Sequence, residues 1–300
     1  MWLELQIFGF QALWSPYFMI YILMIGLIYF LITGPFRHKL GGTSPPSFLQ
    51  KISFYSALFL LYIVKGSPID LMTHITLTAH MIQMGVYLFI FPILIIKGIP
   101  KWIWKKIIYK PVINAIVHLL TKPVISLLLF NALFSFYHVP AIFNFSKSVP
   151  IAHTSISIIL LVAAFIMLLP IVPPIKELDK ISSLLKIVYI LVGSVLITPA
   201  CAIIIFADVP LYDAYTQNGA WLQALSLCVP NNVLQNISSN LSGPEMFTTM
   251  TTLVDQQLGG ITMKIMQEII FGTIYTTIFF KWFNKKEIRK IDPLPNNAQK

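Results

Sequence analysis

The sequence predicts an all-α membrane protein, a polytopic bundle of about seven transmembrane helices with its N-terminus outside the cytoplasm and its C-terminus inside. Of its 300 residues, 57% are hydrophobic and only 11% are charged, and the mean hydropathy is +0.78, which is typical of membrane proteins. Apolar runs of spanning length recur along the chain, and the basic residues between them fall in alternate loops. These observations together predict the fold class.

The apolar runs are bounded by charged residues, Pro and Gly. A bilayer core about 30 Å thick needs roughly 20 apolar residues per helix. Seven runs are found, of which the second is the shortest and the others approach or exceed this length; they cover residues 16–33, 52–64, 74–96, 123–143, 151–173, 184–207 and 258–283. The loops between them are short, so residues 1–300 are expected to form a single integral membrane domain. The first ten residues lack the basic region of a cleavable signal peptide, so the first helix is expected to remain in the mature protein.

The basic residues fix the expected orientation. With the N-terminus outside, the inner segments hold all of the 21 Lys and Arg except Lys65, Lys147 and Lys264. This distribution follows the positive-inside rule at every loop. The net charge of +10 is therefore explained by the membrane topology. The basic clusters are expected to lie on the anionic inner leaflet, and no nucleic-acid partner is expected.

One outer segment is long and acidic. Residues 208–257 contain Asp208, Asp213, Glu245 and Asp255 but no Lys or Arg. Within this acidic segment, residues 220–227 and 244–253 are expected to form short amphipathic helices over the bundle.

Four of the six histidines fall at the outer side of this topology. His38 and His118 lie on the inner side among basic residues. His74 lies at the start of the third run, and His80 lies a turn and a half deeper in the same run. His138 lies at the end of the fourth run, and His153 lies at the start of the fifth. An imidazole is costly in hydrocarbon and usually faces the bundle interior, so this convergence predicts a functional site.

Thioethers accompany these imidazoles. His80 and Met84 are four residues apart and share a helix face, with Gln83 beside them, while His74 and Met81 share a partly offset face. Imidazole and thioether together suit copper, particularly the cuprous ion, so the candidate metal ligands are His80, His138, His153, Met84, Met81 and His74. Methionines that fill apolar gaps and histidines that hydrogen-bond across helices would give the same pattern.

The last apolar run contains a second polar group. Lys264 and Glu268 lie four residues apart on one face and carry opposite charges. They form either a self-neutralising pair or part of an ion relay. Asp255, at the outer start of this run, is expected to orient one of the metal-binding imidazoles without binding the metal itself.

These motifs resemble the CtaG family of bacterial cytochrome c oxidase assembly factors. The resemblance covers most of the chain and is carried by HMIQM on the third run, by a His at the outer end of the next two runs, and by DQQLGG before the last helix. The matching positions are His80, Met81, Gln83, His138, His153, Asp255 and Gln256. Some relatives have a second His where this chain has Met84. The family is distinct from the single-span copper chaperone of similar name.

The resemblance implies a multi-pass protein of the bacterial cell membrane that is needed to make active oxidase of the type with a fused cytochrome c domain. It further implies copper as the cargo, oxidase subunits as partners, and supporting positions for Gln83 and Gln256. Two alternatives remain open: a metal-ion transporter and a haem-binding membrane redox protein. No hydrolase or transferase motif is present, so the chain is expected not to be an enzyme.

Overall fold

The computed structural model describes residues 2–283, and every regular element among them is a helix. Five helices or helical runs are long and apolar enough to cross a membrane: Gln6–Thr33, α4 (Phe48–Gly66), Leu77–Gly98, α12 (Pro150–Leu168) and α13 (Ser183–Ile205). A sixth results if α9 (Pro111–Leu120) and α10 (Pro123–Tyr137), which meet at 80°, count as one span. The predicted all-α fold with several membrane helices is confirmed.

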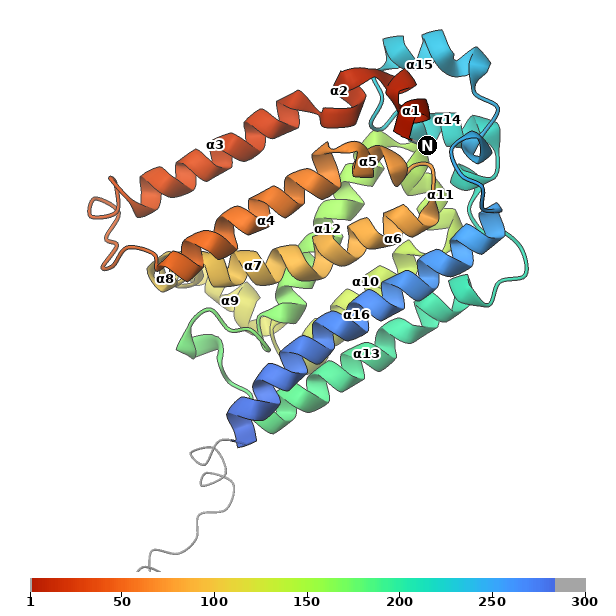
Figure 1. Cartoon of the computed structure of the whole chain (residues 1–300). Helices are drawn as coiled ribbons and strands as arrows, with labels where there is room; N and C mark the ends of the chain where they lie inside the picture. The colour runs from red at the N-terminus through yellow and green to blue at the C-terminus, as the bar shows by residue number, and fades with distance from the viewer. Residues whose placement is uncertain (1, 284–300) are drawn as a thin grey trace, which may run out of the picture.

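The last helix, α16 (Thr252–Phe283), has 32 residues and packs along α13 and α6 (Figure 1). It carries charged side chains near its middle and is not one of the five helices above. Counting α16 as a further span would give seven, so the exact number of spans stays a prediction. The orientation of the termini also stays a prediction, and the basic residues from Lys285 to Lys300 lie outside the described residues.

Two of the membrane-length runs are composite. After α1 (Trp2–Leu5), the first comprises η1 (Gln6–Phe8), α2 (Gly9–Trp14) and α3 (Pro16–Thr33). The third comprises α6 (Leu77–Gly85), the π-helical η2 (Val86–Ile90) and α7 (Phe91–Gly98). Pro92 has no amide hydrogen for the carbonyl four residues earlier, and the wider π turn lies where that α-helical bond is missing.

Prolines and capping residues set where the helices begin. In several helices a proline occupies the first turn, where its missing amide costs nothing; these include Pro16, Pro111, Pro123, Pro140 and Pro150. At α4, Ser47 and Gln50 form a reciprocal capping box. The segment between the third and fourth predicted runs, expected to be a loop, contains α8 (Lys101–Ile108) and α9.

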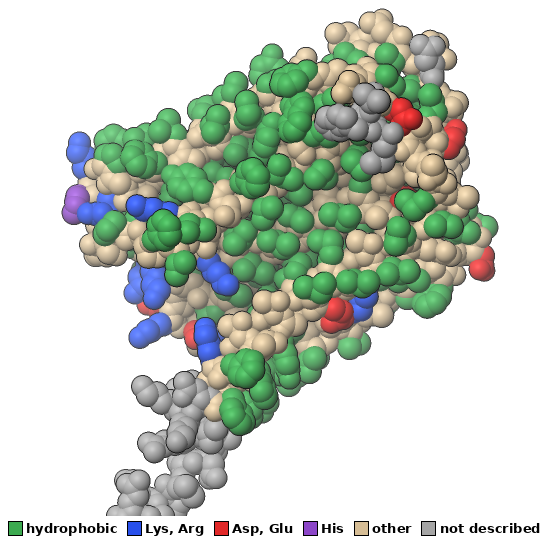
Figure 2. All heavy atoms as spheres, viewed as in Figure 1, with side chains coloured by type: hydrophobic (Ala, Val, Ile, Leu, Met, Phe, Trp, Pro, Cys, Tyr) green, Lys and Arg blue, Asp and Glu red, His purple; other side chains and the backbone are tan. Residues whose placement is uncertain are grey.

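Charged side chains separate toward the two ends of the bundle (Figure 2). We call the end formed by residues 34–47 and α8 the basic end, and the opposite end, formed by α1, α5 (Pro68–Met72) and α11 (Pro140–Ser148), the histidine end. Two acidic residues at the basic end are paired: Lys105 lies 3.1 Å from Glu177, within η3 (Lys176–Leu178), and Lys186 lies 2.6 Å from Asp179.

The acidic segment, residues 208–257, covers the histidine end (Figure 1). It contains η4 (Asp213–Tyr215), α14 (Asn218–Leu225), α15 (Asn231–Ile237), η5 (Ser238–Asn240) and η6 (Pro244–Met246). Helix α14 lies close to the first short helix expected there. The prediction of a second short helix over residues 244–253 is wrong, because only the single turn η6 forms before α16 begins. Residues 221–247 of this segment pack on α1, α2 and α5 in a small apolar core of their own, whereas Tyr212 and Tyr215 belong to the main core of the bundle.

Candidate functional site

The four histidines of the predicted outer side all lie at the histidine end. His74 follows α5, His80 is in the first turns of α6, His138 follows α10, and His153 is in the first turn of α12. His74, His80 and His138 are at most 4% exposed, and His153 is partly buried. Each has one buried ring nitrogen without a hydrogen-bond partner. Unpartnered buried nitrogens on four neighbouring imidazoles are unusual, because buried polar atoms are nearly always satisfied.

The structure divides these histidines into two pairs. In the first pair, the ring centroids of His74 and His153 are 6.0 Å apart and the rings are tilted by 51°. The Nδ1 atom of each ring is unpartnered. Metal–nitrogen bonds to imidazole are about 2 Å long, so two rings at this separation can share one ion.

The second pair, His80 and His138, is separated by aromatic rings. The Nε2 atom of His80 lies 3.3 Å from the Tyr137 hydroxyl, and its ring meets the edge of Phe143 at 5.3 Å. The Nδ1–H group of His138 donates to the Phe134 carbonyl at 2.7 Å. A carbonyl can only accept, so Nδ1 carries the proton and the unpartnered Nε2 of His138 presents a lone pair. This is the tautomer that a metal-binding imidazole needs.

The two predicted thioether ligands, Met81 and Met84, are both buried in the main core. Met84 lies one turn after His80 on the same face of α6. Within the described residues, no group of three or more His, Cys, Asp or Glu side chains could hold a metal ion. A site at this end would therefore rest on paired imidazoles, with the thioethers completing it.

Asp255 has a different partner from the expected one. Its carboxylate accepts the backbone N–H groups of Leu77 at 2.5 Å and Thr78 at 3.2 Å, which are the first two amides of α6. The expectation that Asp255 orients an imidazole directly is wrong on this geometry, because both its oxygens bind the helix N-terminus. Asp255 instead fixes the backbone from which His80 projects.

The predicted supporting residues Gln83 and Gln256 also bind groups other than histidine. Gln83 donates to Asp70 at 2.6 Å and accepts from Lys65 at 3.1 Å, so it joins α6 to the α4–α5 turn. Gln256 accepts from the backbone N–H of Leu211 at 2.7 Å and donates to the Ile204 carbonyl, so it fixes the segment that leaves α13. Both hold the backbone around the site.

Sequence reasoning missed Lys147, which it counted only as an outer lysine. Lys147 is 2% exposed and its ammonium donates to the Thr73 carbonyl at a long 3.4 Å. The ammonium also lies over the rings of Phe143 and Tyr215. Burial, and then the charge of Lys65, lowers its pKa to about 7. Its place in a short segment between two apolar runs was the one feature of the sequence that could have drawn attention to it.

A cavity of about 690 Å³ lies beside the first pair. His74 and His153 line it together with Lys65 and Asp70 at its polar end, and Phe18, Tyr21, Tyr87 and Phe91 are among its apolar walls. The paired imidazoles are therefore next to open space of the size of a small-molecule site.

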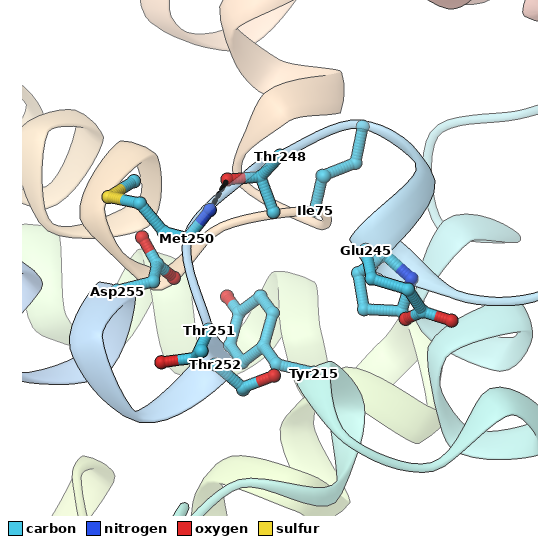
Figure 3. A pocket seen from close by; sticks show the side chains of 9 residues that line it. Ile75, Tyr215, Glu245, Thr248, Met250, Thr251, Thr252 and Asp255 are labelled. Carbon is cyan, nitrogen blue, oxygen red and sulfur yellow. Dashed lines mark hydrogen bonds between the residues drawn. The ribbon is translucent and has the colours of Figure 1, made fainter.

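A second cavity, of about 230 Å³, lies beside Asp255 near the α6 N-terminus (Figure 3). Asp255, Glu245, Met250 and Tyr215 line it, and none of the four histidines does. The Asp255 carboxylate that lines this cavity is already bound to the first amides of α6.

The polar residues predicted in the last apolar run form an ion pair. The Lys264 ammonium lies 2.6 Å from the Glu268 carboxylate. It also donates to the Ser194 carbonyl at 2.9 Å and to Gln267 at 3.1 Å. Sequence reasoning did not include Gln267, which is fully buried, or Ser194, its partner on α13 at 2.6 Å. Together these residues form a polar connection between α13 and α16.

Comparison with known families gives one finding. A family model described as cytochrome c oxidase caa3 assembly factor (Caa3_CtaG) matches residues 27–285. The matched range includes the four histidines of the histidine end, Lys147, Asp255 and the Lys264–Glu268 pair. No curated protein and no solved structure matches the chain.

Proposed function

The chain belongs to the family of cytochrome c oxidase caa3 assembly factors, and from this premise we propose that it holds a cuprous ion at the histidine end and passes it to an oxidase subunit. In this proposal the protein lies in the bacterial cell membrane with its histidine end outward and its basic end on the anionic inner leaflet. It acts by binding and exchange and carries out no catalysis.

The observation that carries the copper proposal is the set of unpartnered ring nitrogens. Leaving a buried polar nitrogen without a partner costs roughly 1–3 kcal/mol, and here four such atoms lie at one end of the bundle. A metal ion bound at either pair would satisfy the two nitrogens of that pair. Imidazole with thioether suits copper better than calcium or magnesium, which prefer oxygen ligands.

The proposed ligands are the ring nitrogens of the two histidine pairs, together with the thioethers of Met84 and Met81, which follow His80 on α6. The two cysteines do not strengthen the site: Cys201 is buried in the main core, and the Cys228 thiol lies 3.5 Å from the Leu225 carbonyl. Histidine and thioether ligands without a thiolate favour exchange over permanent retention, which a hand-over of metal requires.

The remaining residues hold the site in place. Asp255 fixes the start of α6, and the Phe134 carbonyl fixes the tautomer of His138. Phe143, which is fully buried, and Tyr137 exclude water from the space between His80 and His138. A site excluded from water protects a cuprous ion from uncontrolled ligand exchange.

The test is the copper content of detergent-purified protein, measured by elemental analysis under reducing conditions. Wild type is expected to hold about one equivalent, and the His80→Ala/His138→Ala/His153→Ala variant is expected to lose it. The matched control replaces His38 and His118, which lie at the basic end, and should retain copper. Equal copper in all three proteins, or none in wild type, would exclude the proposal.

One observation favours a second candidate, the haem-binding alternative. The paired rings of His74 and His153 line the 690 Å³ cavity, and these two imidazoles would hold the iron of a haem bound there. Purified protein would then show a haem absorption band that His74→Ala and His153→Ala each abolish. A copper-loaded protein without such a band excludes this candidate.

A further inference from the structure

The acidic segment closes the outer surface of the histidine end. The Trp221 indole N–H donates to the His74 carbonyl at 2.9 Å, and the Tyr215 hydroxyl donates to the Thr73 carbonyl at 2.8 Å. Both aromatic residues are at most 2% exposed, and they belong to α14 and η4 of the acidic segment. These two hydrogen bonds attach the acidic segment to the backbone on which His74 lies. An ion approaching along the bundle axis meets this closed layer first.

Access from the side is open. The 690 Å³ cavity reaches the first pair between α3, which supplies Phe18, Tyr21 and Ile25, and α12, which supplies Thr154, Ser157 and Ile158. Tyr21 is 55% exposed and Ile158 is 54% exposed, so they mark the outer rim of the cavity. Both residues lie in helices long and apolar enough to cross the membrane, so the mouth opens on the apolar flank of the bundle.

The second pair has no share in this cavity. Neither His80 nor His138 lines it, and both are at most 4% exposed. The rings of Tyr137 and Phe143 pack against both of these imidazoles. One pair of imidazoles is therefore reachable from the membrane flank, while the other is enclosed.

We propose that the metal enters and leaves the histidine end sideways, through the cavity between α3 and α12, with His74 and His153 as the exchange pair and His80 with His138 as the enclosed pair. This inference rests on the copper-holding function proposed above. A bare cation is costly in hydrocarbon, so the ion passes directly from one set of ligands to the next. The hand-over consequently takes place at the membrane flank, between α3 and α12, where an acceptor can present its own ligands.

The test blocks the cavity and follows the rate of copper release. Ser157→Phe places a ring in the cavity from α12, and Ile159→Phe, on an exposed position of the same helix that does not line the cavity, is the matched control. Cuprous-loaded protein is mixed with the chelator bathocuproine disulfonate, and the coloured complex is followed in time. Ser157→Phe is expected to slow copper release at least about tenfold, with unchanged copper content, while Ile159→Phe behaves as wild type.

A second variant covers the event that Ser157→Phe does not fold. The change Ser157→Cys is introduced together with Cys201→Ser and Cys228→Ser, so that the new thiol is the only one in the chain. This protein is purified, labelled with N-ethylmaleimide and only then loaded with copper, until its copper content is constant. Because the label fills the cavity after folding, it is expected to slow release relative to the equally treated protein that carries the two Cys→Ser changes but keeps Ser157. The control, which carries the two Cys→Ser changes but keeps Ser157, should release copper at the same rate with and without the reagent.

The outcomes separate the two proposals. Copper bound by wild type and released at equal rates from the blocked, labelled and control proteins would overturn the sideways route alone. Faster release from Trp221→Phe, together with no effect of blocking, would also overturn it by placing the route at the acidic segment. No copper in wild type would overturn the copper-holding function and the route together.

Discussion

The carboxylate of Asp255 accepts the backbone N–H group of Leu77 at 2.5 Å, across 178 residues of sequence. Its second oxygen accepts the N–H group of Thr78. The last helix of the described chain thereby caps the helix that carries His80. A carboxylate at a helix N-terminus satisfies amides that have no partner within the helix and interacts favourably with the helix dipole. The position of His80 depends on this contact.

Replacing this cap should loosen the start of α6. We expect Asp255→Ala to lower the free energy of unfolding by about 1–2 kcal/mol and to reduce copper content, because His80 loses its fixed backbone. Thermal unfolding in detergent measures the first effect and elemental analysis the second. Asp208→Ala, at an exposed position of the acidic segment, is the matched control. Equal behaviour of the two variants would show that the cap does not hold the site.

Lys147 predicts a pH dependence of stability. Its pKa is about 7 in the folded protein against 10.5 in the unfolded chain. Between these values the unfolded chain binds more protons, so stability rises as pH increases from 7 toward 10. Below pH 7 both states are protonated and the burial penalty is complete. We expect Lys147→Met to raise the melting temperature at about pH 6 and to flatten the rise toward about pH 9, whereas Lys51→Met, at an exposed position, should leave both unchanged.

The ion pair in the middle of α16 predicts non-additive effects. Removing Lys264 strands the Glu268 carboxylate, which keeps only a 3.3 Å hydrogen bond from Ser194. Removing Glu268 leaves the Lys264 ammonium with the Ser194 carbonyl and Gln267. We expect Lys264→Ala to lower the melting temperature most, Glu268→Ala less, and the double variant least, because an unpaired charge costs more than an absent pair. A double variant as unstable as the sum of the single ones would contradict this.

Two glycines test the packing of the bundle. A Cβ atom on Gly98 would lie 2.7 Å from the backbone nitrogen of Phe54, where α7 crosses α4, and that backbone cannot move aside. Gly98→Ala should therefore destabilise the protein by about 1–3 kcal/mol. A Cβ atom on Gly272, in α16, meets no atom within 4 Å, so Gly272→Ala should be neutral or slightly stabilising. Melting temperatures of the two variants give the comparison, and a fall for both would exclude close packing as the cause.

The sequence predicted the helices better than the site. The apolar runs 16–33, 151–173 and 184–207 correspond closely to α3, α12 and α13, because a bilayer selects each long apolar segment independently of the others. The run 123–143 was wrong near its end: α10 ends at Tyr137, and α11 begins at Pro140. Proline starts the new helix and leaves His138 in the break between them.

The convergence of the four histidines at one end also followed from the sequence, since the count of residues along each helix gives its level in the membrane. Their division into an accessible and an enclosed pair did not. That division depends on Tyr137, Phe143 and the cavity between α3 and α12, and no spacing along the chain encodes contacts between helices. The same holds for Gln267 and Ser194, which meet across two helices.

By itself, the sequence determined the membrane class, the helical fold and the end of the bundle where the imidazoles gather, because each of these follows from hydropathy and charge within single segments. Only the tertiary structure decided that Asp255 binds the α6 backbone, that Lys147 is buried, and which nitrogen of each imidazole lacks a partner. The physical reason is that hydrogen bonding and burial depend on contacts between residues far apart in sequence, which form only when the helices pack.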